Sequence, residues 1–201
     1  MKKGSIVIFG GSFYPPLNSH FSIAQQVLNQ FEEVEKVIFV PINKVSKKKG
    51  LLDNEHRYNM LKLVIEKNEK FEVSDIDFKD EKSSFTIESL EEIEKQFSDK
   101  QIWYIVGTDN LKILYTWKRA EDLVSKYKIL VMERESDSMQ EIVEENLLYA
   151  QYKQNFIAID QGIRSNYNST YVRNQIKKGK SVRYLLPNEV LENIEKNKLY
   201  I

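Results

Sequence analysis

The order of apolar segments in the first 41 residues constrains the fold more than any other feature. Residues 5–9 (SIVIF) form a short apolar run that ends at Gly10 and Gly11, and residues 36–41 (KVIFVP) form a second run that ends at a proline. Between them, residues 20–31 carry apolar side chains at helical spacing. A strand, a helix and a strand in this order predict a βαβ unit, with parallel strands and a right-handed crossover.

The same alternation continues along the rest of the chain. Strands are predicted at residues 71–76, 101–106, 128–132 and 155–159, and helices at 54–68, 84–97, 110–114, 120–125, 138–151, 170–177 and 188–197. This pattern predicts an α/β protein with a Rossmann-like, open and mainly parallel sheet that helices cover on both faces. No internal repeat and no Ser/Pro/Gly-rich linker divides the sequence, so we expect a single domain over residues 1–201.

The composition excludes several classes of protein. Lys and Arg number 30, as do Asp and Glu, and a formal charge of zero disfavours a nucleic acid or a membrane surface as partner. The absence of cysteine excludes disulfides and thiolate chemistry, and the two histidines are too few for a His-rich metal site, so no metal-ligating residues are predicted. No apolar run approaches the ~20 residues of a membrane span or the ~7–15 of a signal peptide. We therefore expect a cytoplasmic globular protein.

The segment that follows the first strand is the first candidate for a ligand site. Gly10, Gly11, Ser12 and Phe13 stand where the carboxyl end of a parallel strand would meet a ligand. Glycines allow a close approach and leave amides for phosphate oxygens, and a helix that begins near residues 18–20 favours anions. Taken alone, the two glycines fit a tight turn equally well. The segment is neither a GxGxxG fingerprint nor a P-loop.

A second candidate lies about 150 residues further along the chain. Residues 168–173 (NSTYVR) combine small polar residues at a predicted helix start with Arg173 in the first turn. Backbone amides, the hydroxyls of Ser169 and Thr170 and a guanidinium group together suit a polyphosphate. Ordinary helix capping also explains this segment when it is considered alone.

The two segments together resemble the signatures of a known enzyme family. Residues 10–20 resemble the nucleotidyltransferase pattern Gly-Gly-(Ser/Thr)-Phe-Asp-Pro-x-His-x-Gly-His, and residues 168–173 resemble Ser-Ser-Thr-x-Ile-Arg. Between them, residues 84–90 (SFTIESL) and 107–117 (GTDNLKILYTW) are similar to segments of bacterial nicotinate-nucleotide adenylyltransferases. This resemblance covers nearly the whole chain. Tyr14, Leu17 and Ser19 depart from the pattern, at its Asp, its first His and its Gly.

The resemblance implies a reaction and its small-molecule partners. ATP would transfer its adenylyl group to nicotinate mononucleotide, giving deamido-NAD and pyrophosphate without a covalent enzyme intermediate. Mg²⁺ would accompany the triphosphate, and the protein would be a monomer or a homo-oligomer. Two alternatives remain open: a divergent nucleotide-binding relative with weak or no catalysis, and a nucleotidyltransferase for another phosphorylated acceptor such as nicotinamide mononucleotide.

The resemblance also assigns roles to residues that match its motifs. His20 and Arg173 would be catalytic. ATP would be bound by Gly10, Gly11, Ser12, Phe13, His20, Asp109, Ser169, Thr170 and Arg173. Nicotinate mononucleotide would be bound by Lys44, Lys47, Thr86 and Trp117, with the indole ring stacked on the pyridine ring.

Several of these residues also allow a purely structural interpretation. His20 could be a partly buried histidine at a helix start, and Asp109 could cap the helix predicted at 110–114. Trp117 could belong to the core, and the loop lysines could be solvated. Arg57 and Arg134 are interpreted as structural or peripheral.

Leu17 is the departure with the largest chemical consequence. Leucine cannot donate a hydrogen bond, and the loss of one donor to a developing charge typically costs about 10²–10³ in rate. The sequence therefore predicts either a rearranged site, in which Asn18 or a lysine substitutes, or a relative that reacts slowly.

Overall fold

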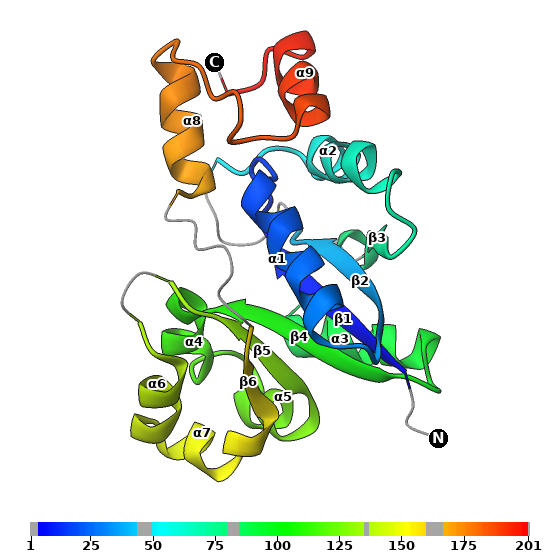
Figure 1. Cartoon of the computed structure of the whole chain (residues 1–201), viewed down its shortest axis with the longest axis vertical. Helices are drawn as coiled ribbons and strands as arrows, with labels where there is room; N and C mark the ends of the chain where they lie inside the picture. Colours follow the sequence, from blue (N-terminus) through cyan, green and yellow to red (C-terminus); the bar gives the residue numbers. More distant parts are fainter. Residues whose placement is uncertain (1–3, 44–49, 80–84, 135–136, 160–166, 201) are drawn as a thin grey trace.

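The strands of the protein form one parallel sheet (Figure 1). A computed structural model describes residues 4–43, 50–79, 85–134, 137–159 and 167–200. Within these residues the sheet has six strands in the order β3-β2-β1-β4-β5-β6, and every neighbouring pair is parallel. The strands are β1 (Ser5–Gly11), β2 (Val34–Pro41), β3 (Phe71–Val73), β4 (Gln101–Gly107), β5 (Lys128–Met132) and β6 (Phe156–Ala158). The predicted Rossmann-like α/β class is confirmed.

The strand order reverses between β1 and β4, and this point determines where a ligand can bind. β1 pairs with β2 as far as Gly11 and Pro41, but its pairing with β4 runs only to Ile8 and Tyr104. The two central strands therefore separate at their carboxyl ends, where Gly10 and Gly11 stand. In open α/β sheets, this is the crevice in which ligands bind.

Helices cover both faces of the sheet. They are α1 (Asn18–Gln30), α2 (Asn54–Ile65), α3 (Thr86–Gln96), α4 (Thr108–Leu114), α5 (Ala120–Lys126), α6 (Met139–Glu145), α7 (Leu147–Gln151), α8 (Ser169–Lys177) and α9 (Asn188–Lys196). Because side chains alternate along a strand, Val7 and Phe9 of β1 pack with α1, whereas Ile6 and Ile8 pack in the cluster that contains α3 to α7. The strands are thus buried on both faces, as their nearly continuous apolar sequences predict.

A third apolar cluster joins the C-terminal part of the chain to the start of α1. Leu17, directly before α1, packs with Met60 of α2 and with residues of α8, of α9, of their connection and of the segment after α9. Those residues are Val172, Val182, Leu186, Val190, Ile194 and Leu199. Figure 1 shows α8 and α9 beside α2, at the end of the molecule far from α6 and α7. This cluster places the start of α8 near the carboxyl end of β1.

Some element boundaries differ from the sequence-based prediction. The strand predicted at 71–76 ends at Val73, and a 3₁₀ turn (Ile76–Phe78) follows it. The helix predicted at 138–151 is divided at Asn146, whose side chain accepts hydrogen bonds from the N–H groups of Leu148 and Tyr149 and so caps α7. Apolar periodicity continues across this break, and so periodicity alone predicts one helix.

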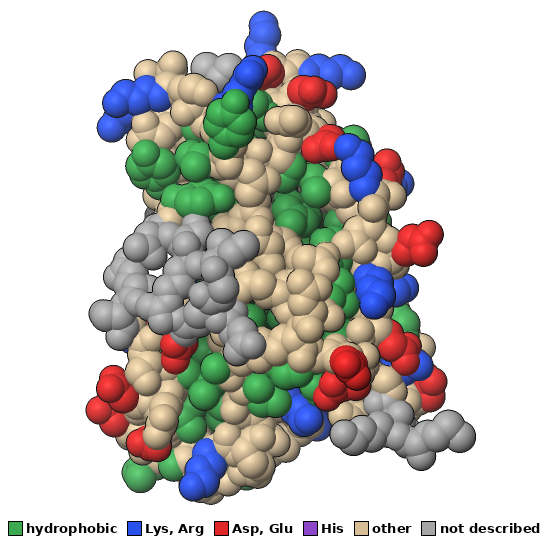
Figure 2. All heavy atoms as spheres, in the orientation of Figure 1, with side chains coloured by type: hydrophobic (Ala, Val, Ile, Leu, Met, Phe, Trp, Pro, Cys, Tyr) green, Lys and Arg blue, Asp and Glu red, His purple; other side chains and the backbone are tan. Residues whose placement is uncertain are grey.

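The surface agrees with the charge balance of the sequence. On the face drawn in Figure 2, both basic and acidic side chains are spread around the molecule. Within the described part of the chain, no helix combines the length and the apolar character that crossing a bilayer requires.

Candidate functional site

A cavity of about 420 Å³ lies at the carboxyl ends of the central strands. Its wall is built from the ends of β1, β4 and β5, from the starts of α1, α4 and α8, and from the residues that join them. All of the predicted ATP-binding residues line it. They are Gly10, Gly11, Ser12, Phe13, His20, Asp109, Ser169, Thr170 and Arg173. The fold therefore brings together residues that are up to about 160 positions apart in the sequence, while their individual roles remain predictions.

Close backbone packing explains two of the glycines in this wall. A Cβ atom at Gly10 would lie 2.9 Å from the hydroxyl oxygen of Tyr104, and one at Gly107 would lie 2.9 Å from Nε of Arg134. Both distances are shorter than carbon tolerates, so a side chain at either position would displace a cavity residue. The absence of a side chain thus keeps Tyr104 and Arg134 at the wall.

His20 lies in the first turn of α1 and is held as a neutral side chain. Its Nδ1 accepts a hydrogen bond of 2.9 Å from the N–H of Leu17, which places the remaining proton on Nε2. The rings of Phe9 and Phe13 meet the imidazole edge-on, with centroids 5.9 Å and 5.1 Å away. Burial, and secondarily the charge of Arg134, lower the pKa of His20 to about 3. At neutral pH the group is therefore an uncharged hydrogen-bond donor.

Leu17 is part of the apolar packing at the start of the same helix. Its side chain is 1% exposed, belongs to the third cluster and also lines the cavity. Asn18, one suggested substitute for the missing donor, instead donates from Nδ2 to the carbonyl of Tyr184 at 2.8 Å. The other suggested substitutes, the lysines at positions 44, 47 and 48, lie outside the described residues.

The start of α8 is bonded directly to the segment after β1. The hydroxyl of Ser169 donates to the carbonyl of Pro15 at 2.9 Å, and Nη1 of Arg173 donates to the carbonyl of Tyr14 at 2.7 Å. The two sequence motifs therefore form one structural unit.

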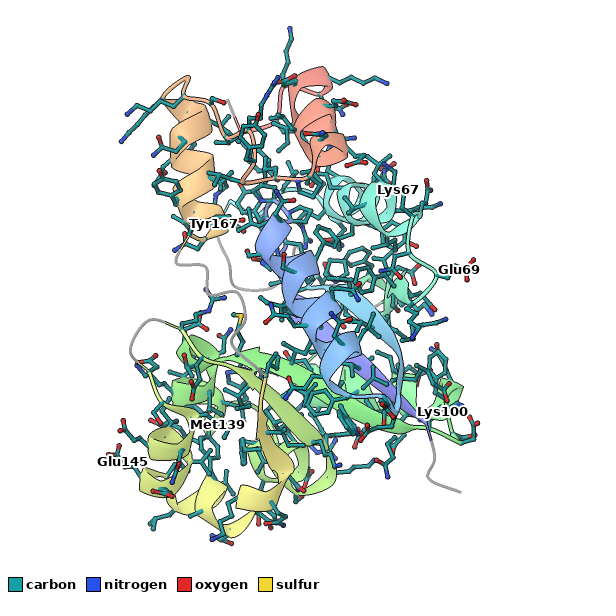
Figure 3. The ribbon with its side chains drawn as sticks, in the orientation of Figure 1. Lys67, Glu69, Lys100, Met139, Glu145 and Tyr167 are labelled. Atoms are coloured by element: carbon teal, nitrogen blue, oxygen red, sulfur yellow. The ribbon has the colours of Figure 1, made fainter. Side chains whose placement is uncertain are left out.

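Asn168 is the N-cap of α8, since its side chain accepts from the N–H of Tyr171 at 2.9 Å. The helix predicted to begin at residue 170 therefore begins one residue earlier, at Ser169, and the asparagine before it is the cap. Tyr167, which precedes the cap, lines the cavity beside the start of α1 (Figure 3).

The guanidinium group of Arg173 has a defined position at the cavity wall. Nη2 donates to the hydroxyl of Thr170 at 3.0 Å, and the group lies over the ring of Tyr14, with Cζ 4.3 Å from the ring centroid. An arginine has five N–H groups. In Arg173 two of them are used, one by the Tyr14 carbonyl and one by the Thr170 hydroxyl. The other three have no described partner and are able to bind an anion.

Arg134 lines the cavity, whereas the sequence interpretation took it as structural or peripheral. It stands two positions after the end of β5, its N–H donates to the Thr108 hydroxyl at 3.0 Å, and its Nε lies 3.2 Å from Oδ1 of Asp109. The rule that ligands meet the carboxyl ends of strands would have found it. Asp109 lies inside the first turn of α4, which begins at Thr108, and therefore it does not cap the helix.

Arg57 has the structural position that the sequence interpretation expected. It is fully buried and donates to the carbonyls of Leu52 and Ser12 and to Oδ1 of Asn54. Through Ser12 it supports the turn after β1.

Of the residues expected to bind the nicotinate end, the two that the structure describes, Thr86 and Trp117, are not among those that line the cavity. Thr86 is the first residue of α3 and lies near the hydroxyl of Tyr104, which does line the cavity. Burial raises the pKa of that hydroxyl to about 12. Trp117 is half-buried against the main core, between α4 and α5, and is not among the cavity residues. Lys44 and Lys47 lie outside the described residues.

Comparison with known proteins gives the family. A family model described as Cytidylyltransferase-like matches residues 8–175, a range that contains both motifs and most of the cavity wall. The chain thus belongs to the cytidylyltransferase-like family.

Two curated bacterial relatives define the family more closely. A protein of Caldicellulosiruptor saccharolyticus is 37% identical over 199 residues, which cover 97% of this chain and 98% of the relative. A protein of Clostridium tetani is 34% identical over 203 residues and the whole of both chains. Both are named "Probable nicotinate-nucleotide adenylyltransferase". The chain belongs to the nicotinate-nucleotide adenylyltransferase family.

Solved structures agree on the fold. A nicotinic acid mononucleotide adenylyltransferase of Plasmodium falciparum, complexed with NaAD, superposes with a TM-score of 0.82 at 19% sequence identity, over 98% of this chain and 97% of the other. A structure of the Plasmodium falciparum enzyme complexed with APC gives a TM-score of 0.79 at 18% identity.

Proposed function

We propose that this protein transfers the adenylyl group of ATP to nicotinate mononucleotide, giving deamido-NAD and pyrophosphate. The observation that carries the proposal is the direct bonding of the two motif segments around one cavity, through Ser169 to Pro15 and Arg173 to Tyr14. The names of the full-length relatives support this acceptor. Since the substrates are metabolites of the cell interior, we expect the reaction to take place in the cytoplasm.

In the proposed reaction, a phosphate oxygen of the mononucleotide attacks the α-phosphorus of ATP. A bond forms between that oxygen and the phosphorus, and the bond to the β-phosphate oxygen breaks, so that pyrophosphate leaves with the electron pair. Catalysis of this kind depends mainly on positioning and on stabilisation of the developing charge. The protein needs no covalent intermediate for it.

The cavity residues have the chemistry that this reaction requires. The Nε2–H of neutral His20 would donate to the α-phosphate as its charge develops, and the backbone at Gly10 and Gly11 would allow the nucleotide to approach the end of β1. The amides at the start of α8 and the guanidinium of Arg173 would bind the β- and γ-phosphates. Asp109 would accept hydrogen bonds from a ribose.

The acceptor would bind towards α3. Tyr104 lines the cavity and lies near Thr86, so this edge of the cavity leads towards one of the residues expected to bind nicotinate. Trp117 would meet the pyridine ring if the acceptor extends past Tyr104. Lys44 and Lys47 remain expected phosphate ligands.

Magnesium would enter with the triphosphate. Asp109 is the one carboxylate among the described residues that line the cavity, and those described residues contain no group of three or more His, Asp or Glu side chains able to hold a metal. This donor set fits an ion held mainly by phosphate oxygens and water, which is how Mg²⁺ usually accompanies nucleotides. The ion would supply neutralisation of the phosphate charge.

Pyrophosphate release by the purified full-length protein tests the proposal. With ATP and MgCl₂, nicotinate mononucleotide should support faster release than nicotinamide mononucleotide or phosphopantetheine, and a reaction without acceptor gives the background. If none of these acceptors supports pyrophosphate release above the background, the proposal is contradicted.

A second candidate is a nucleotide-binding protein with little or no turnover. The observation that favours it is Leu17, which is packed into the third cluster where a hydrogen-bond donor would otherwise face the cavity. Calorimetry that shows ATP binding, together with no pyrophosphate release, would support this candidate.

A further inference from the structure

Tyr14, in the segment after β1, contacts Arg173, one of the residues expected to bind ATP, in two ways. Its ring lies under the guanidinium of Arg173 at 4.3 Å, and its carbonyl accepts the 2.7 Å hydrogen bond from Nη1 of the same arginine. Its hydroxyl donates to the carbonyl of Gly50 at 2.5 Å. One tyrosine thus holds the guanidinium by its ring and its backbone, and a distant loop by its hydroxyl.

Tyr200, close to the end of the chain, packs against the ring of Tyr14. The two rings meet edge-on, with centroids 5.1 Å apart and planes inclined by 61°. The backbone of Tyr200 is left-handed, with φ of 68°, a conformation that a tyrosine keeps only where its surroundings hold it. Its hydroxyl is buried without a hydrogen-bond partner among the described residues, so its ring, rather than its hydroxyl, makes the contact.

We propose that Tyr14 and Tyr200 form an aromatic support that positions Arg173 for the triphosphate of ATP. An arginine side chain has many rotamers, and fixing it when a ligand binds costs affinity. A guanidinium already held over an aromatic face avoids much of that cost, and it keeps three N–H groups for phosphate. The support acts through Arg173, and Tyr14 and Tyr200 are positioning residues.

The chemistry of the tyrosine ring suits this task. A carboxylate at position 14 would also orient the guanidinium, but it would compete with the phosphates for the same N–H groups and would repel their charge. An aromatic face attracts the cation without adding a negative charge. The inference rests on the proposed function only in that ATP is taken as the ligand of Arg173.

ATP binding is the first measurement, made by calorimetry on the full-length protein with a non-hydrolysable ATP analogue and Mg²⁺. Tyr14→Leu, which removes the aromatic face, should weaken binding about three- to tenfold, as expected for loss of a cation–π contact and of preorganisation. Tyr14→Phe, which keeps the ring and loses the bond to Gly50, should bind within about twofold of the parent protein. Equal losses in the two variants would overturn the proposal.

Tyr200 gives a second pair of variants that does not disturb the turn after β1. Tyr200→Leu should weaken ATP binding less than Tyr14→Leu does, and Tyr200→Phe should leave it unchanged because the hydroxyl has no described partner. Tyr171→Leu is the matched control: this tyrosine lies on α8 close to Arg173, but its side chain is 48% exposed. If Tyr14→Leu does not fold, as judged by circular dichroism, the Tyr200 pair decides the question.

A double-mutant cycle separates positioning from general support of the fold. In an Arg173→Ala background, Tyr14→Leu should cause no further loss of ATP affinity, since the support acts through that arginine. A full additional loss in that background would overturn the proposal. In steady-state assays, Tyr14→Leu should raise the KM for ATP more than it lowers kcat.

These outcomes distinguish the inference from the proposed function. If the parent protein binds the ATP analogue but releases no pyrophosphate with any acceptor, the proposed function fails while the binding measurements still decide the role of the aromatic support. If the parent protein does not bind the analogue, both are overturned.

Discussion

Two helix starts meet at the cavity, and their construction differs. α1 begins after Leu17, a buried apolar residue whose N–H is bonded by the neutral ring of His20. α8 begins after Asn168, a polar cap, and carries Arg173 one turn later. Both helix starts belong to the wall of the cavity, where the positive end of a helix dipole favours an anion. The difference lies in the side chains that accompany each helix start.

This difference indicates two separate tasks within the proposed reaction. Arg173 has a fixed positive charge, which suits the charge that the β- and γ-phosphates already carry before reaction. His20 is uncharged, so it adds little to the binding of ATP in the ground state. Its donated hydrogen bond becomes stronger as charge develops on the α-phosphate, which is the condition for an effect on rate. Variants at the start of α1 should therefore change kcat, and variants at the start of α8 should change the affinity for ATP.

His20→Ala is the variant with the largest expected effect. Loss of the Nε2–H donor of His20 should lower kcat about 10²–10³-fold, with little change in the KM for ATP. Pyrophosphate release over a range of ATP concentrations measures both. His56→Ala is the control, because the other histidine of the sequence is not among the residues that line the cavity. A large increase in KM with unchanged kcat would contradict the division between the two helix starts.

Leu17→His tests whether the start of α1 has been rebuilt around an apolar side chain. Leu17 is 1% exposed within the third cluster, so an imidazole there should lower the free energy of unfolding by about 1–3 kcal/mol. Because the packing of α2, α8 and α9 surrounds this position, we expect no gain in kcat. Urea unfolding and pyrophosphate release measure the two effects, with the nearly isosteric Leu17→Met as control. A gain in kcat would show that the site lacks only its missing donor.

The buried neutral state of His20 predicts how stability depends on pH. Its pKa is about 3 in the folded protein and near 6.5 when unfolded, because burial disfavours the charged form. Above about pH 7 both states are neutral, and this group has no effect. As the pH falls from 6.5 towards 3, only the unfolded state takes up the proton, so stability falls by at most about 1.4 kcal/mol per pH unit.

His20→Asn isolates this contribution, since its amide oxygen is able to accept from Leu17. The stability advantage of the parent protein over the variant should shrink between pH 7.5 and pH 5 in urea unfolding experiments. Carboxylates that titrate in the same range cancel in this difference. A difference that stays constant with pH would show that the imidazole titrates freely, and that α1 does not hold a neutral donor.

Most of the fold could be predicted from the sequence, because five of the six described strands contain an uninterrupted apolar segment. The division of the predicted helix at Asn146 could not be predicted. The apolar residues around an asparagine have the same spacing whether that asparagine caps a helix or lies within one. The short β3 is a similar case: the alternation of residues 71–76 continues where hydrogen bonding to β2 stops. The alternation of residues in one strand does not show where hydrogen bonding to its partner strand ends.

The residues that the motifs single out are the ones that the fold brings together. The glycines at the end of β1 and the residues after Asn168 were identified from their motifs, and they line one cavity. Arg134 was misplaced because it follows β5 without a motif, and no local signal marks its ion pair with Asp109. The packing of Leu17 depends on the last 30 residues of the chain, which no local pattern connects to position 17.

Substitutions of Asn168 should have the smallest effects on stability and on binding, and they test the start of α8 without changing the start of α1. Asn168→Ala removes the side-chain acceptor for the N–H of Tyr171 and should lower the free energy of unfolding by about 1 kcal/mol. Asn168→Asp keeps an acceptor, so stability should be nearly unchanged, but it adds a negative charge at the cavity wall. It should therefore weaken binding of the ATP analogue several-fold in calorimetry while leaving kcat close to that of the parent protein. If Asn168→Asp binds the analogue as tightly as the parent protein does, the start of α8 does not face the triphosphate, and the charge of Arg173 must act elsewhere.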